Sequence, residues 1–243
     1  MAMHNLSEQL VHDLGKQIIR EDIPSGKVLP KVEVMSEQYG VSRTVVREAL
    51  KGLAARRLVK SVPKAGTVIC AREDWQWWDP QVLSWACECI PDDHFFQQLT
   101  EMRLAIEPTT AELAAKNATR EDINHITTCF QRLEHSVISG NESKWASADY
   151  DFHQSIMVAS HNELLINLGG LLKNALLQSR HRTMKVYNND GERESAISKE
   201  QALLLHKNVY IAICKGDRIE ARESMYNLIS YVNKILEESN SKD

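Results

Sequence analysis

Residues 37–50 are Glu37-Gln-Tyr-Gly-Val-Ser-Arg-Thr-Val-Val-Arg-Glu-Ala-Leu50, a sequence that predicts the turn and the second helix of a helix-turn-helix. Gly40 ends one helix, because glycine reaches the left-handed conformation without steric cost. Ser42 is a good N-cap for the next helix, because its hydroxyl can accept a free backbone N–H. Apolar residues then recur at helical spacing and give this helix one buried face: Val45, Val46, Ala49, Leu50 and Leu53.

Four basic or hydroxyl residues lie largely off that apolar face: Arg43, Thr44, Arg47 and Lys51. Such side chains near a helix N-terminus suit the DNA major groove, where Arg binds guanine and Thr can contact a thymine methyl. The alternative is a surface helix with ordinary charges. We therefore predict contacts with double-stranded operator DNA from these four residues.

A β-hairpin with a basic tip is predicted directly after this helix. Leu58-Val59 and Thr67-Val68-Ile69 are strand formers, and Pro63-Lys64-Ala65-Gly66 has the composition of a turn. A hairpin in this position corresponds to the wing of a winged helix. Lys64 and Gly66 are therefore added to the predicted DNA-binding residues.

Together these residues resemble the winged helix of the GntR family of bacterial transcription regulators. The block from Gly40 to Leu50 matches the family signature almost throughout. Lys31 and Val32 stand where the family usually has Ser-Glu, so the preceding helix loses its usual N-cap, and Glu33 stands where many members carry a DNA-contacting Arg. These departures from the family pattern imply that the DNA contacts come mainly from the second helix and the wing, and less from the helix before.

The charge distribution agrees with a DNA-binding head on a separate body. The chain of 243 residues has a formal net charge of −4. Residues 1–72 hold 12 Lys and Arg against 7 Asp and Glu, and subtracting these from the totals of 29 and 33 leaves 17 against 26 for the remainder. No apolar run approaches a signal peptide or a membrane span, so we expect a cytoplasmic protein that does not contact the membrane.

The remainder of the chain predicts helices without strand alternation or a phosphate-binding loop. The expected fold class is mainly α: an N-terminal winged helix-turn-helix with a small β-wing, and a C-terminal all-α antiparallel helical bundle. The expected domains are residues 1–71 for DNA binding, 72–94 as a linker with a short helix, and 95–243 for effector binding and dimerisation. One long apolar helix is expected over Leu164 to Leu177, with a loop at 188–191. Tryptophans at 75, 77 and 78 either dock the head onto another surface or pack within the linker.

The body also resembles a family, the FCD ligand-binding domain of the fatty-acid-regulator subfamily of GntR proteins. The resemblance rests on Glu101 to Pro108, Asp149-x-x-Phe-His153, Asn162, His206 and Ala221-Arg222 in this order. Residues 75–85 most resemble members that control sugar-acid catabolism, of the galactonate-operon type.

A metal site is predicted from Asp149, His153 and His206. Asp149 and His153 are four apart on one helix face, and a carboxylate with an imidazole suits a divalent transition metal. The alternatives are an intrahelical pair and a core histidine. The resemblance implies an Asp and three His, but Leu228 stands near the place of the fourth ligand. The site therefore binds metal weakly, leaves a position for the effector, or has lost the metal; zinc is the first choice, and nickel or manganese the next.

An anionic effector is predicted from Arg103 and Arg182, because arginine pairs with carboxylates in bidentate fashion. The resemblance places an Arg at Arg103 against the effector pocket. The alternatives are a salt bridge from Arg103 to a neighbouring acid, Glu101 included, and a solvated helix end for Arg182. A sugar acid, aldonate or hexuronate, fits a pocket of cations and polar side chains.

The sequence thus predicts a homodimeric, effector-responsive transcription regulator, a repressor of a sugar-acid operon that its ligand releases from DNA. The alternatives are a metal-sensing regulator without an organic ligand and a metal-dependent enzyme with an accessory winged helix. No Ser-His-Asp or Cys-His arrangement supports catalysis, so we expect no enzyme.

Overall fold

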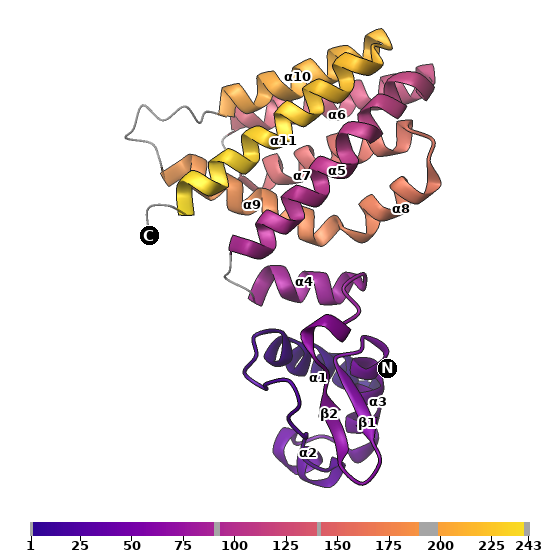
Figure 1. Cartoon of the computed structure of the whole chain (residues 1–243), viewed down its shortest axis with the longest axis vertical. Coiled ribbons are helices and arrows are strands. Elements are labelled where there is room, and N and C mark those ends of the chain that lie inside the picture. Colours follow the sequence, from indigo (N-terminus) through magenta and orange to yellow (C-terminus); the bar gives the residue numbers. More distant parts are fainter. Residues whose placement is uncertain (1, 90–92, 140–141, 190–198, 241–243) are drawn as a thin grey trace. The chain divides into compact units, whose positions relative to one another are not determined.

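The computed structural model describes the backbone of residues 2–89, 93–139, 142–189 and 199–240, and the side chains of 6–89, 95–137, 144–181 and 200–234. The chain divides into two compact units, Met1–Pro91 and Asp92–Asp243, which we call the head and the body. The described residues are mainly helical, with one two-stranded antiparallel sheet (Figure 1). The predicted fold class is confirmed.

The head is built from four helices, a 3-10 turn and one hairpin within its described residues. In chain order they are α1 (Ala2–Ile19), α2 (Val32–Tyr39), α3 (Arg43–Ala55), β1 (Val59–Val62), β2 (Gly66–Ile69), η1 (Arg72–Asp74) and α4 (Pro80–Cys89). α3 packs against α1 and α2, and α4 packs against α1. Residues 72–89 of the expected linker therefore form η1 and α4, inside the head unit.

Local signals place α2 and α3 as the sequence predicts. Gly40 caps α2 in the left-handed conformation at φ 63°. The Ser42 hydroxyl accepts the backbone N–H of Val45 at 3.3 Å and so caps α3. Lys31 at the start of α2 makes no side-chain capping bond, as its departure from the family pattern implies.

The tryptophans of residues 75–85 differ in their surroundings. Trp75 and Trp85 are buried in the head, and the Trp75 indole donates to the carbonyl of Cys70. Arg72 lies over the rings of Trp75 and Trp77 at 5.6 and 5.1 Å. Packing within the segment accounts for Trp75 and Trp77, and Trp85 packs against His12 of α1, whereas Trp78 is 54% exposed.

The body is a bundle of seven helices over the described residues. They are α5 (Asp93–Asn117), α6 (Arg120–Ser139), α7 (Glu142–Ala159), α8 (Glu163–Leu171), α9 (Lys173–Asn189), α10 (Lys199–Lys215) and α11 (Arg218–Asn240). Figure 1 shows α11 running between α5 and α10, both of which it contacts. The helices enclose one apolar core, in which the rings of Phe130 and Tyr210 stack at 4.9 Å.

The single helix predicted over Leu164 to Leu177 is wrong. The chain forms α8 and α9 instead, with Leu172 as the residue between them. Gly169 and Gly170 precede the break, and glycine is a poor helix former. α9 also continues through Asn189, so the loop predicted at 188–191 is wrong for its first two residues, and the other two lie outside the described residues.

Candidate functional sites

The outer face of α3 carries the predicted DNA-binding residues. Arg43, Thr44, Arg47 and Lys51 are all exposed, while Val45, Val46, Ala49 and Leu53 are buried. Two of the cations already have acidic neighbours: Arg43 lies 3.8 Å from Glu33, and Lys51 lies 2.8 Å from Glu48. Arg47 has no polar side-chain partner within the described part of the chain. It is therefore the cation of α3 with the fewest competing interactions.

The wing presents Lys64 at its tip. β1 and β2 pair from Val59 opposite Ile69 to Val62 opposite Gly66. The turn between them places Lys64 at φ 65° and Gly66 at φ 103°, both exposed. A side chain at Gly66 would be strained at this φ, so the glycine supports the turn rather than supplying a side-chain contact.

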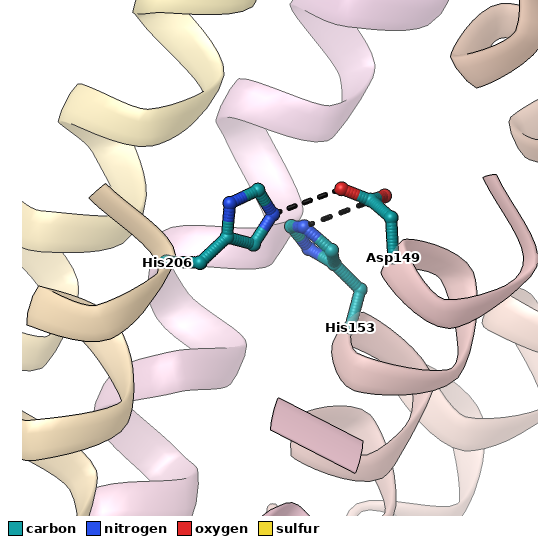
Figure 2. A group of neighbouring side chains, drawn as sticks. All are labelled: Asp149, His153 and His206. Carbon is teal, nitrogen blue, oxygen red and sulfur yellow. Dashed lines mark hydrogen bonds and ion pairs between the residues drawn. The ribbon is translucent and has the colours of Figure 1, made fainter. Parts of the chain in front are cut away.

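The body holds a buried cluster of ionisable side chains around Asp149 (Figure 2). Asp149 and His153 come from α7 and His206 from α10, and their ligand atoms all lie within 4.8 Å of one another. All three are buried, with exposed fractions of 6%, 4% and 2%. The structure thus brings together the three residues that the sequence proposes as metal ligands.

Hydrogen bonds fix the tautomer of both histidines. His206 Nδ1 must donate to the Ala202 carbonyl oxygen, 2.7 Å away, because a carbonyl has no proton to give. His153 Nδ1 donates to Glu107 Oε2 at 2.5 Å. In a neutral imidazole the remaining nitrogen, Nε2, then carries no proton and presents a lone pair. Both Nε2 atoms lie toward Asp149, at 2.9 Å for His206 and 3.9 Å for His153.

This arrangement fits a metal ion. A lone pair on His206 Nε2 facing Asp149 Oδ1 at 2.9 Å is repulsive unless a proton or a cation lies between them. A histidine whose other nitrogen donates to a carboxylate or carbonyl is the usual metal-ligating arrangement, and Glu107 and Ala202 supply those acceptors. Leu228 is buried and lines the same cavity, so it adds an apolar wall and no ligand.

The charges of the cluster are paired across helices. Arg103 Nε donates to Glu107 Oε1 at 2.7 Å, and Arg180 of α9 contacts Asp149 through its Nε. Burial opposes ionisation of Glu107, but Arg103 and His153 outweigh it and hold the pKa of Glu107 well below its usual range. Burial likewise opposes ionisation of Asp149, and Arg180 with the histidines lowers the pKa of Asp149.

Burial acts in the other direction on His153. It outweighs the attraction of Glu107 and Asp149 and lowers the pKa of His153. The neutral imidazole is the form that ligates a metal, so this direction favours the proposed site.

The predicted effector residues have different outcomes. Arg103 is buried and lines the cavity, but its guanidinium is paired with Glu107 and not left for an anionic ligand. The predicted alternative of a salt bridge is correct in kind, with Glu107 in place of Glu101. The side chain of Arg182 lies outside the described residues.

Arg180 is the residue that sequence reasoning left out of the effector site. Its Nη1 and Nη2 are buried and have no hydrogen-bond partner among the described residues. An unpaired buried donor is costly, and the cost is greater when the group carries a charge. The guanidinium of Arg180 is positioned by its contact with Asp149, which is 31 residues away in the sequence. No local pattern around Arg180 indicates this contact.

The cavity at this site is small. It measures about 20 Å³ and is bordered by Arg103, Arg180, both histidines and Leu228. A water molecule needs roughly 10–15 Å³ by this kind of measure, whereas pockets for organic ligands occupy roughly 300–1,000 Å³. In this conformation the cavity has room for one ion or water and not for a sugar acid.

Comparison with known proteins gives matches over both units. The family model for "Bacterial regulatory proteins, gntR family" matches residues 6–69, and the FCD domain model matches residues 98–231. The galactonate operon transcriptional repressor of Escherichia coli K12 is 27% identical over 96% of this chain and 98% of its own length. The Uxu operon regulator of Haemophilus influenzae is 29% identical over 99% of this chain and 87% of its own length. Among solved structures, Lar of Listeria monocytogenes has the same fold, with a TM-score of 0.64 at 16% identity over 96% of each chain.

Proposed function

Because this chain belongs to the gntR family of bacterial regulatory proteins and carries an FCD domain, we propose that it is a homodimeric repressor of a sugar-acid operon, released from its operator by that acid. Membership makes it a DNA-binding transcription regulator with an effector-binding domain, and not an enzyme. No described helix is long and apolar enough to cross a bilayer. We place its action in the cytoplasm, where operator DNA is found.

DNA binding is assigned to α3 and the wing. Arg43, Thr44, Arg47 and Lys51 provide the exposed face of α3, and Lys64 with the turn at Gly66 provides the wing tip. A dimer with two such heads binds two half-sites of a palindrome. The partnerless Arg47 is the residue assigned to base contacts.

The body site is assigned to a divalent transition metal, with zinc first and nickel or manganese next. Asp149, His153 and His206 would hold it, with His153 and His206 oriented by Glu107 and Ala202. A bound metal would supply a Lewis acid suited to carboxylate and hydroxyl groups of the effector. Leu228 offers no competing ligand atom at that position.

The observation that carries the effector proposal is the pair of unpartnered nitrogens on Arg180. Two parallel N–H donors of a guanidinium match the two oxygens of a carboxylate. The two histidines and Asp149 border the same cavity as Arg180. A sugar acid whose carboxylate binds Arg180 would therefore have its hydroxyl groups beside polar side chains. The name of the galactonate relative supports an aldonate.

Effector binding must expand the cavity, because about 20 Å³ cannot hold such a molecule. The ligand then selects a body conformation that differs from the one described here. Only a difference in affinity between the two conformations can shift the balance between DNA-bound and free protein. Repression is therefore relieved by the expanded state.

The test is a gel shift with a selected operator and a panel of galactonate, gluconate, glucuronate and galacturonate. We expect one acid to release wild-type protein and to raise the melting temperature of the body, and Arg180→Met to need a far higher concentration of it. Arg132→Met, which removes an exposed arginine of α6, is the matched control and should respond like wild type. If no acid of the panel changes DNA binding or stability, the sugar-acid assignment is wrong.

A further inference from the structure

The end of α3 is tied to the start of α4 by one guanidinium. Arg56, the C-cap residue of α3, places its Nε 3.2 Å from Asp79 Oδ1 and its Nη2 2.6 Å from Gln81 Oε1. Its Nη1 donates to the carbonyl of Gly52 in α3 at 3.0 Å. The guanidinium also lies 5.8 Å from the ring centroid of Trp85 in α4. Two of its three nitrogens thus bridge α3 to the start of α4, and the third bonds within α3.

The acceptor on the other side is itself a helix cap. Asp79 Oδ1 accepts the backbone N–H groups of Gln81 and Val82, at 2.8 and 3.1 Å, and so caps the N-terminus of α4. The backbone adds a second link, because the N–H of Gln76 donates to the carbonyl of Arg56 at 3.0 Å. The pair therefore connects a helix that faces DNA to the first turn of α4.

The rest of α4 is anchored on α1. The Trp85 indole donates to His12 Nδ1 at 2.8 Å, and Lys16 pairs with Glu88 at 2.6 Å. A Cβ on Gly15 would meet the Trp85 ring at 2.4 Å, so the two helices are in close contact there. α4 is thus held by α1 along its length and by Arg56 at its start.

α4 is the last described element before the body begins at Asp92. The covalent connection from the body therefore reaches α3 by way of α4. We propose that Arg56 is a positioning residue, which holds α3 at a fixed orientation to α4 so that the two heads of a dimer match one spacing of operator half-sites. This inference rests on the proposed dimeric function.

The physical basis is the effective concentration of the second head. Once one head is bound, the second binds intramolecularly, with a strength set by how well the connection holds it in place. A loosened α3–α4 junction spreads the second head over more orientations. Binding to a full palindrome then weakens, while binding to a single half-site does not change.

Two variants test the link with little other damage: Arg56→Met removes it, and Asp79→Asn weakens it by turning an ion pair into a neutral hydrogen bond. Arg56→Met keeps an apolar stem beside Trp85 and removes the guanidinium. Asp79→Asn removes the charge but keeps the cap of α4, because asparagine is as good an N-cap as aspartate. Arg20→Met, which removes an exposed cation of the head, is the control for net charge.

The experiment measures the affinity of the full-length protein for three duplexes at one salt concentration. They are the palindrome selected by wild type from a random library, a single half-site, and the palindrome with one base pair added between half-sites. For Arg56→Met we expect the palindrome affinity to fall by about tenfold, the half-site affinity to stay within about twofold, and the discrimination between the two spacings to shrink. Asp79→Asn should change the same quantities in the same direction but by less. Arg20→Met should keep the discrimination of wild type.

Equal losses on palindrome and half-site would make Arg56 a DNA contact or a residue needed for folding of the head, and would overturn the inference. Unchanged discrimination in both variants would overturn it as well. If wild type itself binds palindrome and half-site equally, the proposed dimeric function fails, which is a distinct result. Melting curves of each variant identify a loss that comes from unfolding.

Discussion

At the scale of single residues, the body site depends on which atom each neighbour offers. His153 and His206 each donate a hydrogen bond from Nδ1 to an oxygen. The Nε2 atom of each ring lies toward Asp149. Glu107 orients His153 and also neutralises Arg103. One carboxylate therefore serves both the proposed metal ligand and the cation beside it.

Substitution of these side chains should distinguish residues that bind the metal directly from residues that orient a metal ligand. His153→Ala should abolish metal binding, because a ligand is lost. Glu107→Gln should still bind a metal, but with an affinity lowered by roughly 10–100-fold, since a residue that orients a metal ligand has an effect of that size. Elemental analysis of purified protein, followed by titration against a chelator, measures both. A Glu107→Gln protein with wild-type metal affinity would contradict the role given to Glu107.

Arg47 is the corresponding residue on the head. Arg47→Ala should cost roughly 1–3 kcal/mol of operator binding and relax the preference at one base pair, because a direct contact to a base is lost. Lys51→Ala should cost less and reduce affinity for all sequences, since Lys51 is already paired with Glu48. Binding to a library of single-base operator variants measures the difference. Equal base preferences in wild type and Arg47→Ala would refute the assignment.

At the scale of elements, α8 contains two adjacent glycines with opposite surroundings. A Cβ on Gly169 would lie 2.3 Å from Met157 Sδ and 2.5 Å from Gln154 Oε1, whereas a Cβ on Gly170 meets nothing within 4 Å. Gly169 is buried against α7, and Gly170 is exposed. The first glycine allows close packing, and the second only weakens the helix.

Alanine at the two positions should therefore have opposite effects on the free energy of unfolding of the body. Gly170→Ala should stabilise the body by about 0.5–1 kcal/mol through helix propensity. Gly169→Ala should destabilise it, because the side chains of the buried Met157 and the half-buried Gln154 must move. Urea denaturation followed by circular dichroism gives both values. We expect the free energy of unfolding to be highest for Gly170→Ala, intermediate for wild type and lowest for Gly169→Ala. A reversed order would contradict the packing of α8 on α7.

At the scale of the whole molecule, the two units carry different charge and different chemistry. The head holds 12 Lys and Arg against 11 Asp and Glu and exposes most of its cations, whereas the body holds 17 against 22 and buries a cluster of charged side chains. The buried cluster makes the stability of the body depend on pH. In the folded body the pKa values of His153, Glu107 and Asp149 are all lowered.

Acid should destabilise the metal-free body in two stages. The unfolded state binds more protons than the folded state wherever a folded pKa is lowered, so stability falls as pH falls. For His153 the loss begins below its ordinary value of 6.5, and for Glu107 and Asp149 below 4.5 and 3.8. Melting curves with a chelator between about pH 8 and 3 test this. His153→Gln should remove the first stage, and an unchanged profile in that variant would contradict the assignment.

Much of the head could be predicted from the sequence, because its signals are local. The αL glycine at Gly40, the cap at Ser42 and the helical period of the apolar residues act within a few positions of one another. The same period separates the exposed side chains of α3 from its buried ones. The four-residue spacing of Asp149 and His153 likewise predicts a shared face on one helix.

Only the tertiary structure decides the partners within the body. His153 meets Glu107 across 46 residues, His206 meets Asp149 across 57, and Arg180 meets Asp149 across 31. These contacts depend on how four helices pack, and helical periodicity says which face is buried but not which side chain lies opposite. For that reason the sequence predicted the types of residue at the site, while packing decided which of them are paired. It left Arg180 with two nitrogens that have no partner among the described residues, beside a cavity with room for one ion or water.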